Sequence, residues 1–546
     1  MKVHAILAAF PRACPNAIKI ACTTLLCALL VSGAAPQNEL RFCIEGDPKT
    51  FDPQQVSEEN SEVIRYLTGG ALVRVNRVTD KPEPELAESW NAAADGRSIS
   101  FHLRAGLKFS DGSALTAADV ARTFNTALDP KLASPAGDTF RSEGGIPEAK
   151  AISPRDVVIL YPTPKADMDR LFDSLSIIPA NPGKMPVSAG PFFVAEYRPG
   201  DHVLLKRNPN YWKRDAAGRQ LPYLDSIRID IQPNRDIQLV RFLRGEIHLV
   251  GKLTPEGFDR VAKEKPAAAR NAGASLDPEF LWFNQMPSAA VPEWKRKWFT
   301  SAAFRHAVSA SIKRDDIARI VFRGHAHPAF GPISPANKFW FNAALKPLPY
   351  DPQAALRSLA AEGFRMTGGV LRDSGGHPVE FSIVTGAGNR PREAMAAVVQ
   401  DDLRAIGIQV NIVTLDFPSL IERIMKTSQY EAALLGFANV EIDPNEQMNV
   451  WLSSGAQHAW WPFQKTPATP WEARIDQLQM AQASEPSRAL RKKAIDEFQR
   501  IVVEQEPIIY LVNPDYLAAI SPSLHGAQVA AAPPQVLWNI EWLRLE

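Results

Sequence analysis

The chain has 546 residues, and its 61 lysines and arginines against 60 aspartates and glutamates give a formal net charge of +1. Such a balance creates no field that would hold a polyanion, which argues against a nucleic-acid partner and against a polybasic membrane patch. A hydrophobic content of 45% in a chain of this length predicts two or three folded cores. The 45 prolines favour many connecting segments, and therefore a large mixed α/β protein.

Residues 1–35 have the three-part composition of a secretory signal peptide. Basic residues come first, the apolar run 20–31 follows, and the small residues 32–35 end the segment. The 12-residue run would span about 18 Å as a helix, short of the roughly 30 Å hydrocarbon core, so a permanent membrane span is the weaker interpretation. Neither Cys22 nor Cys27 lies where a lipidated cysteine belongs. We therefore expect a cleaved signal peptide and a periplasmic mature protein.

A single cysteine, Cys43, would remain after removal of this segment, because the other three lie within residues 1–35. The exported chain would then have no internal disulfide, and its hydrophobic cores alone must hold the fold. Cys43 lies in the strand-like run 40–44, where a buried and unreactive thiol is expected.

Further along the chain, local patterns predict strands and capped helices. Residues 98–103 alternate between polar and apolar types, which is typical of a half-buried strand. Thr116 is a suitable N-cap for the helix that follows, with Asp119 at its third position. Asp351, which precedes a proline, is a suitable N-cap for a second helix, and Gly363 lies just past the expected end of this second helix.

Signatures of catalysis and of metal binding are absent from the sequence. It contains no His-Glu-x-x-His, no Cys-x-x-Cys and no Gly-x-Ser-x-Gly, and the fragment 245–253 has one residue too many for a phosphate loop. His325 and His327 would face the same side of a strand, but no cysteine or carboxylate stands at ligand spacing beside them. We therefore expect no catalytic residue, no metal, no cofactor and no enzymatic activity.

One stretch carries a specific resemblance to a known family. Residues 101–112 read Phe-His-Leu-Arg-Ala-Gly-Leu-Lys-Phe-Ser-Asp-Gly, between Trp90 and the run Leu-Thr-Ala-Ala-Asp-Val at 115–120. This closely resembles the signature of the family 5 extracellular solute-binding proteins, the peptide- and nickel-type receptors of ATP-driven importers. Six shorter pieces lie in the family's order along the mature chain: Phe51-Asp52-Pro53, Gly190-Pro191-Phe192, Arg207-Asn208-Pro209-Asn210-Tyr211-Trp212, Leu243-Arg244-Gly245-Glu246-Ile247, Phe304-Arg305-His306-Ala307 and Tyr350-Asp351-Pro352.

The resemblance implies a bilobal α/β fold of the periplasmic-binding-protein type, with a cleft between the lobes and a subdomain inserted in the first. A two-strand crossover between the lobes would act as the hinge. On this chain the resemblance places lobe I at 36–75 and 180–275, the inserted subdomain at 76–179, lobe II at 276–510, and a return to lobe I at 511–546.

The function implied by the resemblance is solute binding without chemistry. Closure would enclose a peptide-like or other small solute, and the closed receptor would deliver it to the permease and ATPase subunits of an ABC importer. The receptor is expected to be a monomer. Two other classes stay open: a secreted hydrolase, and a haem or metal receptor of the same fold that would use His325, His327 or methionine side chains.

A departure from the family pattern bears on the solute. Peptide-binding members carry a lobe II motif whose first aspartate holds the α-ammonium group of the peptide, and residues 436–444 align with it without a gap. The aligned residue is Val440, so a free amine would need Glu441 or another acid as its partner, because burying an unpaired ammonium is costly. Asp443 is retained, but its place before Pro444 suits a helix N-cap without any ligand. We expect a neutral or N-blocked solute.

Aromatic residues of lobe II complete the predicted site. Eight of the twelve tryptophans lie between Trp282 and Trp471. Trp460 and Trp461 are adjacent, so in an extended chain they point to opposite sides and at most one of them faces the cleft. The candidate ligand-binding residues are Asn284, Phe437, Asn439, Val440, Glu441, Trp460 and Trp461.

Overall fold

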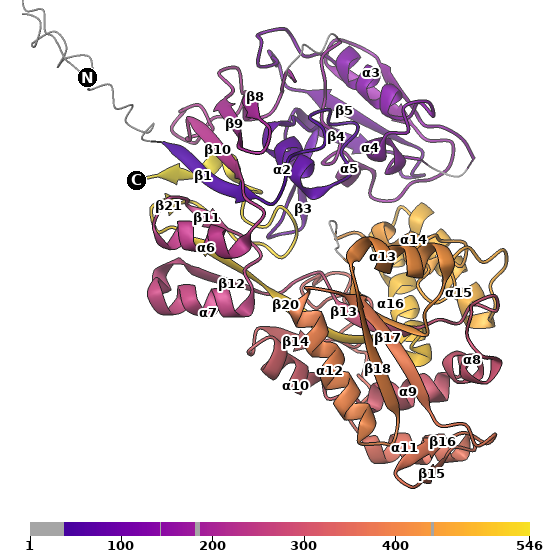
Figure 1. Cartoon of the computed structure of the whole chain (residues 1–546). Coiled ribbons are helices and arrows are strands. Elements are labelled where there is room, and N and C mark those ends of the chain that lie inside the picture. The colour runs from indigo at the N-terminus through magenta and orange to yellow at the C-terminus, as the bar shows by residue number, and fades with distance from the viewer. Residues whose placement is uncertain (1–37, 142–143, 181–185, 438–441) are drawn as a thin grey trace, which may run out of the picture.

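The computed structural model describes residues 38–141, 144–180, 186–437 and 442–546, and they form two lobes (Figure 1). Lobe I, the upper one in this view, contains the N-terminal part of the described chain together with its C-terminal end. Lobe II, the lower one, contains the residues between them. The predicted signal peptide, residues 1–35, lies outside the described residues. In the part of the chain that the structure describes, no helix has both the length and the apolar character needed to cross a membrane.

Lobe I is built on one half of a 12-stranded sheet. Its strand β1 alternates, with Leu40, Phe42 and Ile44 buried, and pairs in parallel with β10. Helix α2 packs against β8, and Ile64 and Leu67 of this helix belong to the same hydrophobic core as the strands. The elements are β1 (Glu39–Ile44), α2 (Glu59–Thr68), β8 (Phe192–Arg198), β9 (His202–Arg207), β10 (Ser226–Ile231), α6 (Arg235–Leu243), β11 (Leu249–Val250), α7 (Pro255–Glu264), β12 (Ala269–Ala274), β21 (Leu524–His525) and β22 (Arg544–Leu545).

A subdomain of lobe I has its own four-stranded sheet, in the order β4-β5-β7-β6, and its own core. The predicted strand 98–103 is confirmed, and the predicted helix begins after Thr116, whose backbone N–H donates to the Asp119 carboxylate at 2.9 Å. The elements are the hairpin β2 (Val73–Asn76) and β3 (Lys81–Pro84), then β4 (Ala87–Ala92), β5 (Ser98–Leu103), α3 (Ala117–Ala127), α4 (Pro135–Asp138), β6 (Glu148–Ala151), β7 (Asp156–Leu160) and α5 (Met168–Leu171).

Lobe II carries the other half of the 12-stranded sheet, covered by helices. The predicted cap at Asp351 is confirmed, because its carboxylate accepts the backbone N–H of Ala354 at 2.7 Å. The elements are β13 (Glu279–Phe283), α8 (Glu293–Thr300), α9 (Ala302–Ser311), α10 (Arg314–Asp316), β14 (Ala326–Pro328), α11 (Pro352–Ala361), β15 (Arg365–Thr367), β16 (Val370–Arg372), β17 (Glu380–Gly386), α12 (Arg390–Arg404), β18 (Gln409–Leu415), α13 (Phe417–Glu422), β19 (Ala432–Gly436), α14 (Met448–Trp451), α15 (Pro470–Ser484) and α16 (Arg488–Gln505).

Two crossings of the backbone join the lobes. One leads from β12 in lobe I to β13 in lobe II, between residues 274 and 279. The other lies inside the long strand β20 (Ile508–Ile520), which pairs with β13 through residues 508–512 and with β12 and β11 through residues 515–520. Both lobes therefore share one continuous strand, and the second crossing falls between residues 512 and 515.

Candidate functional site

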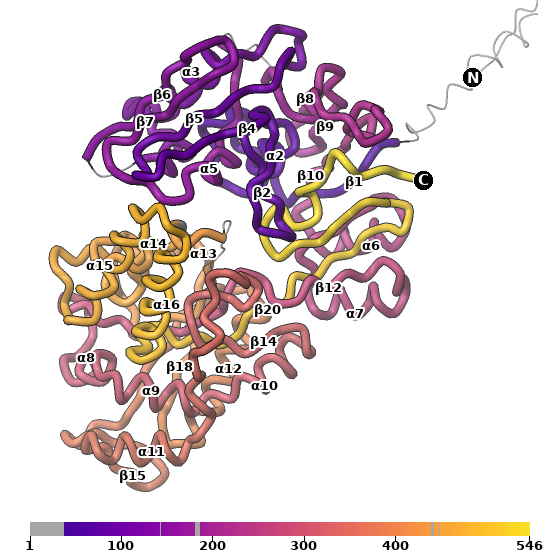
Figure 2. Tube along the Cα trace, turned by 180° about the vertical axis from the view of Figure 1, so that it is seen from behind, coloured from indigo at the N-terminus to yellow at the C-terminus, as the bar shows by residue number. Residues whose placement is uncertain are grey.

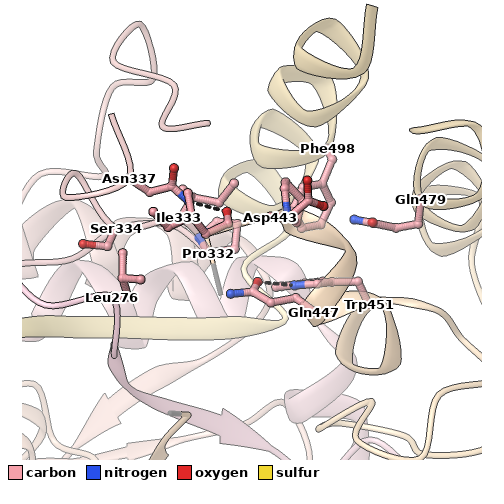
Figure 3. A pocket seen from close by; sticks show the side chains of 12 residues that line it. Leu276, Pro332, Ile333, Ser334, Asn337, Asp443, Gln447, Trp451, Gln479 and Phe498 are labelled. Carbon is pink, nitrogen blue, oxygen red and sulfur yellow. Dashed lines mark hydrogen bonds between the residues drawn. The ribbon is translucent and has the colours of Figure 1, made fainter. Parts of the chain in front are cut away.

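Residues 442–444, the end of the segment that aligns with the family's ligand motif, form one side of a small cavity of about 20 Å³ in lobe II (Figure 3). Asn337 holds this segment by donating from Nδ2 to the carbonyl oxygen of Ile442 at 2.7 Å, and Trp451 donates from Nε1 to Gln447 at 3.1 Å. The volume is close to that of a single water. These residues therefore form a packed support for the segment rather than a chamber for a solute. The cavity is lined by Leu276, Pro332, Ile333, Ser334, Asn337, Ile442, Asp443, Pro444, Gln447, Trp451, Gln479 and Phe498.

Both carboxylate oxygens of Asp443 accept hydrogen bonds from neighbours within the protein. Its Oδ1 accepts the backbone N–H of Asn445 at 3.0 Å, as the predicted N-cap of a short 3-10 turn requires. Arg491 on α16 donates to both carboxylate oxygens, at 2.7 and 2.9 Å. Such a two-pronged pair is among the stronger polar contacts in proteins. Asp443 therefore has an internal countercharge.

Arg491 also reaches across to lobe I. Its Nη1, one of the two nitrogens that donate to Asp443, also donates to the carboxylate of Asp167, the residue before α5, and the Arg491 side chain is 0% exposed. Close by, Arg488 pairs with Asp80 of the β2–β3 turn at 2.6 Å. The backbone N–H of Ala166 donates to the carbonyl oxygen of Ala483 at 3.2 Å. The start of α16 and the end of α15 thus touch the subdomain of lobe I, a contact region that Figure 2 shows from behind.

The electrostatics of this cluster follow from one buried cation shared by two acids. Burial favours the neutral form of Asp443, but the Arg491 guanidinium outweighs burial and holds the pKa of Asp443 below its ordinary value. Burial raises the pKa of Asp167, against the opposing effect of Arg491. Burial also disfavours the charge on Arg491, yet its two carboxylate partners raise the pKa of the guanidinium, so it stays protonated.

Two of the residues predicted from sequence to bind the solute, Asn284 and Trp460, are buried in lobe II. Asn284 is 0% exposed and donates to the carbonyl oxygens of Ser428 and Tyr430, both at 3.0 Å. Trp460 is 1% exposed, and its indole donates to Glu472 at 2.9 Å. Both side chains therefore lie in the interior of lobe II in this conformation.

Two further candidates, Phe437 and Trp461, are partly buried against one hydrophobic core of lobe II. Phe437 is half-buried and packs against the ring of Phe280, with centroids 4.7 Å apart. Trp461 is half-buried at the edge of the same core. The remaining candidates, Asn439, Val440 and Glu441, lie outside the described residues.

The two histidines considered as metal ligands are used in contacts near the crossings. His325 pairs with Asp259 of α7 at 3.0 Å and stacks edge-on against Phe258, while His327 lies 3.0 Å from Asp515 of β20. Within the described ranges, no group of three or more histidines, cysteines, aspartates or glutamates is arranged to hold a metal ion.

A larger cavity of about 450 Å³ lies within lobe I, between the β2–β3 hairpin and the C-terminal segment. A chain of ion pairs forms part of its lining, in which Lys213 contacts Glu541 at 2.6 Å and Glu85 at 3.4 Å. Tyr211 donates to the same Glu85 at 2.7 Å. Because Glu541 belongs to the C-terminal segment, this chain of contacts fixes that segment to the body of lobe I.

The residues that sequence analysis missed are those that connect the lobes. Arg488 and Arg491 are three positions apart on α16, a spacing that places them on one helix face. That spacing is the one signal present in the sequence. Their partners Asp80 and Asp167 are 408 and 324 positions away, and no local pattern relates residues so far apart.

Comparisons with known proteins agree with this architecture. The model of the bacterial extracellular solute-binding proteins, family 5 Middle, matches residues 81–459. A probable ABC transporter-binding protein of Deinococcus radiodurans is 30% identical over 408 residues, or 68% of this chain and 67% of that protein. Di/tripeptide-binding protein 2 of Pseudomonas aeruginosa is 28% identical, over 90% and 92% of the two chains. The crystal structure of NikA from Brucella suis in complex with Fe(III)-EDTA matches 94% of this chain and 100% of that one, with a TM-score of 0.79 and 21% identity.

The two-lobed fold and these matches define a class, the solute-binding proteins that work outside the cytoplasmic membrane. Within that class, the chain belongs to family 5 of the bacterial extracellular solute-binding proteins, because the family model covers more than half of its length. The family and the bilobal α/β fold predicted from the sequence are thereby confirmed.

Proposed function

We propose that this protein is a periplasmic receptor that encloses a small peptide-like solute between its lobes and presents it to the permease and ATPase subunits of an ABC importer. Its family supports this role, as do the names of relatives, one a di/tripeptide-binding protein and another a probable ABC transporter-binding protein. The two crossings, at residues 274–279 and 512–515, suit a hinge. The protein acts as a monomer and binds without chemistry.

The solute of this receptor lacks a free α-ammonium group. The observation that carries this step is the internal countercharge of Asp443, whose two oxygens already accept from Arg491 and from the backbone of Asn445. The side chain of Val440, at the aligned ammonium position, has no hydrogen-bond acceptor and no charge. Glu441 is then the one remaining acid in residues 436–444. A neutral or N-blocked solute needs no countercharge here and avoids the cost of burying an unpaired cation.

Calorimetry with di- and tripeptides, each in free and N-acetylated form, tests this assignment. We expect the acetylated form to bind at least as tightly as the free form, and Glu441→Gln to leave the ratio unchanged. Glu504→Gln, which alters an exposed carboxylate on α16, is the matched control. If acetylation weakened binding by roughly 1.5–3 kcal/mol, as the loss of a charged hydrogen bond would, and Glu441→Gln removed the difference, Glu441 would be the ammonium partner and the assignment would be wrong.

A further inference from the structure

Two arginines of lobe II and two aspartates of lobe I face each other across the interlobe contact. Arg488 and Arg491 lie one turn apart at the start of α16. Their partners, Asp80 and Asp167, both have left-handed backbone conformations, with φ of 55° and 44°. This region is uncommon for residues other than glycine, although aspartate enters it more readily than most. Both turns of lobe I thus hold an uncommon conformation at the point where they meet α16.

Arg491 occupies the centre of this contact. Asp443 faces it from lobe II and Asp167 faces it from lobe I, and the side-chain oxygen of Gln482 accepts from it at 2.9 Å. Its guanidinium lies 4.9 Å from the centre of the Trp340 ring. The other charged groups that act on the two carboxylates are Lys165, Arg170 and Arg488. Each of these three is more exposed than Arg491, which is the buried cation in direct contact with both acids.

We propose that Arg491 is the positioning residue for lobe closure, the shared countercharge that allows Asp443 and Asp167 to come together from opposite lobes. Without it, closure would bury two carboxylates beside each other, and like charges at such a site cannot both stay ionised. Closure would then require uptake of a proton or the loss of one acid. The inference rests on the proposed function only in that closure of the lobes serves solute capture.

Cross-linking of the solute-free chain tests this role. Cysteines introduced by Ala166→Cys and Ala483→Cys lie at two positions whose backbones are hydrogen-bonded across the lobes, so the rate of disulfide formation reports the closed fraction. Burial raises the pKa of the native Cys43 thiol to about 11, which keeps it from competing. In this background Arg491→Met should slow cross-linking at least about tenfold. Arg491→Met combined with Asp167→Asn should cross-link faster than Arg491→Met alone, because the repulsion between two buried acids is then removed.

Three comparisons make the result specific. Asp167→Asn alone should stay within about threefold of the parent, because Asp443 still neutralises Arg491. Arg500→Met, which removes an exposed i,i+4 pair from the same helix, should also stay within about threefold. Arg491→Lys keeps the charge and should cross-link faster than Arg491→Met. If Arg491→Met fails to fold, Arg491→Gln replaces it in the same comparison.

The proposal is overturned by an unchanged rate in the Arg491 variant, by failure of Asp167→Asn to rescue it, or by equal rates for the lysine and methionine variants. No solute enters the assay. A negative result would therefore leave the assignment of the solute class untouched, and a failed calorimetric test would leave the role of Arg491 in closure untouched.

Discussion

Two buried glutamates of lobe II have pKa values shifted in opposite directions, so their contributions to the stability of the protein change with pH in opposite ways. Glu506 is 6% exposed, and burial raises its pKa to about 7, although Ser309 donates to it at 2.8 Å and Arg314 and Arg305 are near. Burial also acts on Glu472, but hydrogen bonds from several neighbours outweigh it and hold the pKa at about 2. The neighbours that donate to Glu472 or contact it are His458, Trp460, Gln464 and Thr469.

Glu506→Gln should stabilise the protein at alkaline pH. The folded-state pKa of Glu506 lies above its ordinary value of 4.5, so its contribution is complete below about pH 4.5 and is lost as the pH rises through about 7. We expect the glutamine variant to gain roughly 1–3 kcal/mol of unfolding free energy at about pH 8, with no difference at about pH 4. Urea unfolding at the two pH values measures both quantities.

The matched variant Glu472→Gln should behave in the opposite way. The folded-state pKa of Glu472 lies below its ordinary value, so its contribution is present above about pH 4.5 and is lost as the pH falls towards 2. The variant should therefore be less stable than the parent at neutral pH. The same sign of effect for both glutamine variants would contradict this account of the two sites.

For single residues, the sequence shows which residue types depart from a family pattern, but not whether a side chain faces the solute or the protein interior. The replacement at Val440 can be read directly from residues 436–444, and the unreactive state expected for Cys43 agrees with its raised pKa. Asn284 and Trp460 were expected at the solute, yet both are buried with internal partners. An aromatic cluster looks alike in sequence whether it lines a cleft or fills a core, since both environments favour the same side chains.

Among secondary-structure elements, helix starts were the easiest feature to predict. The caps at Thr116 and Asp351 depend on a side chain and a backbone group only three residues apart, so the whole interaction is contained in a short run of sequence. The division of β20 between two lobes depends instead on strands more than two hundred residues away. No periodicity within residues 508–520 indicates where one partner ends and the next begins.

Asp351→Ala should destabilise lobe II by about 1 kcal/mol. The carboxylate satisfies the backbone N–H of Ala354 in the first turn of α11, and loss of such a cap typically costs about 0.5–2 kcal/mol. Chemical denaturation followed by circular dichroism gives the free energy of unfolding. Asp351→Asn keeps an acceptor oxygen and should lose much less. Equal losses for the alanine and asparagine variants would show that the cap does not explain the stability of this helix.

For the whole molecule, the arrangement of the lobes predicts a change of size on binding. The crossings at residues 274–279 and 512–515 are the two covalent links between the lobes, while the remaining interlobe contacts are side-chain and backbone interactions that can separate. Solution scattering should show a smaller radius of gyration with a saturating peptide, identified by calorimetry, than without it. The bound profile should match the structure described here. An unchanged radius at saturation would contradict closure about a hinge.

The shared strand β20 also determines when each lobe can be finished during synthesis. Strands β13 and β11 each lack one of their neighbours, and β12 lacks its partner, until residues 508–520 have been made. Open strand edges can pair with wrong partners. Both lobes of the nascent chain therefore remain open to mispairing until synthesis is nearly complete. Lobe I, whose synthesis begins first, is therefore completed no earlier than lobe II.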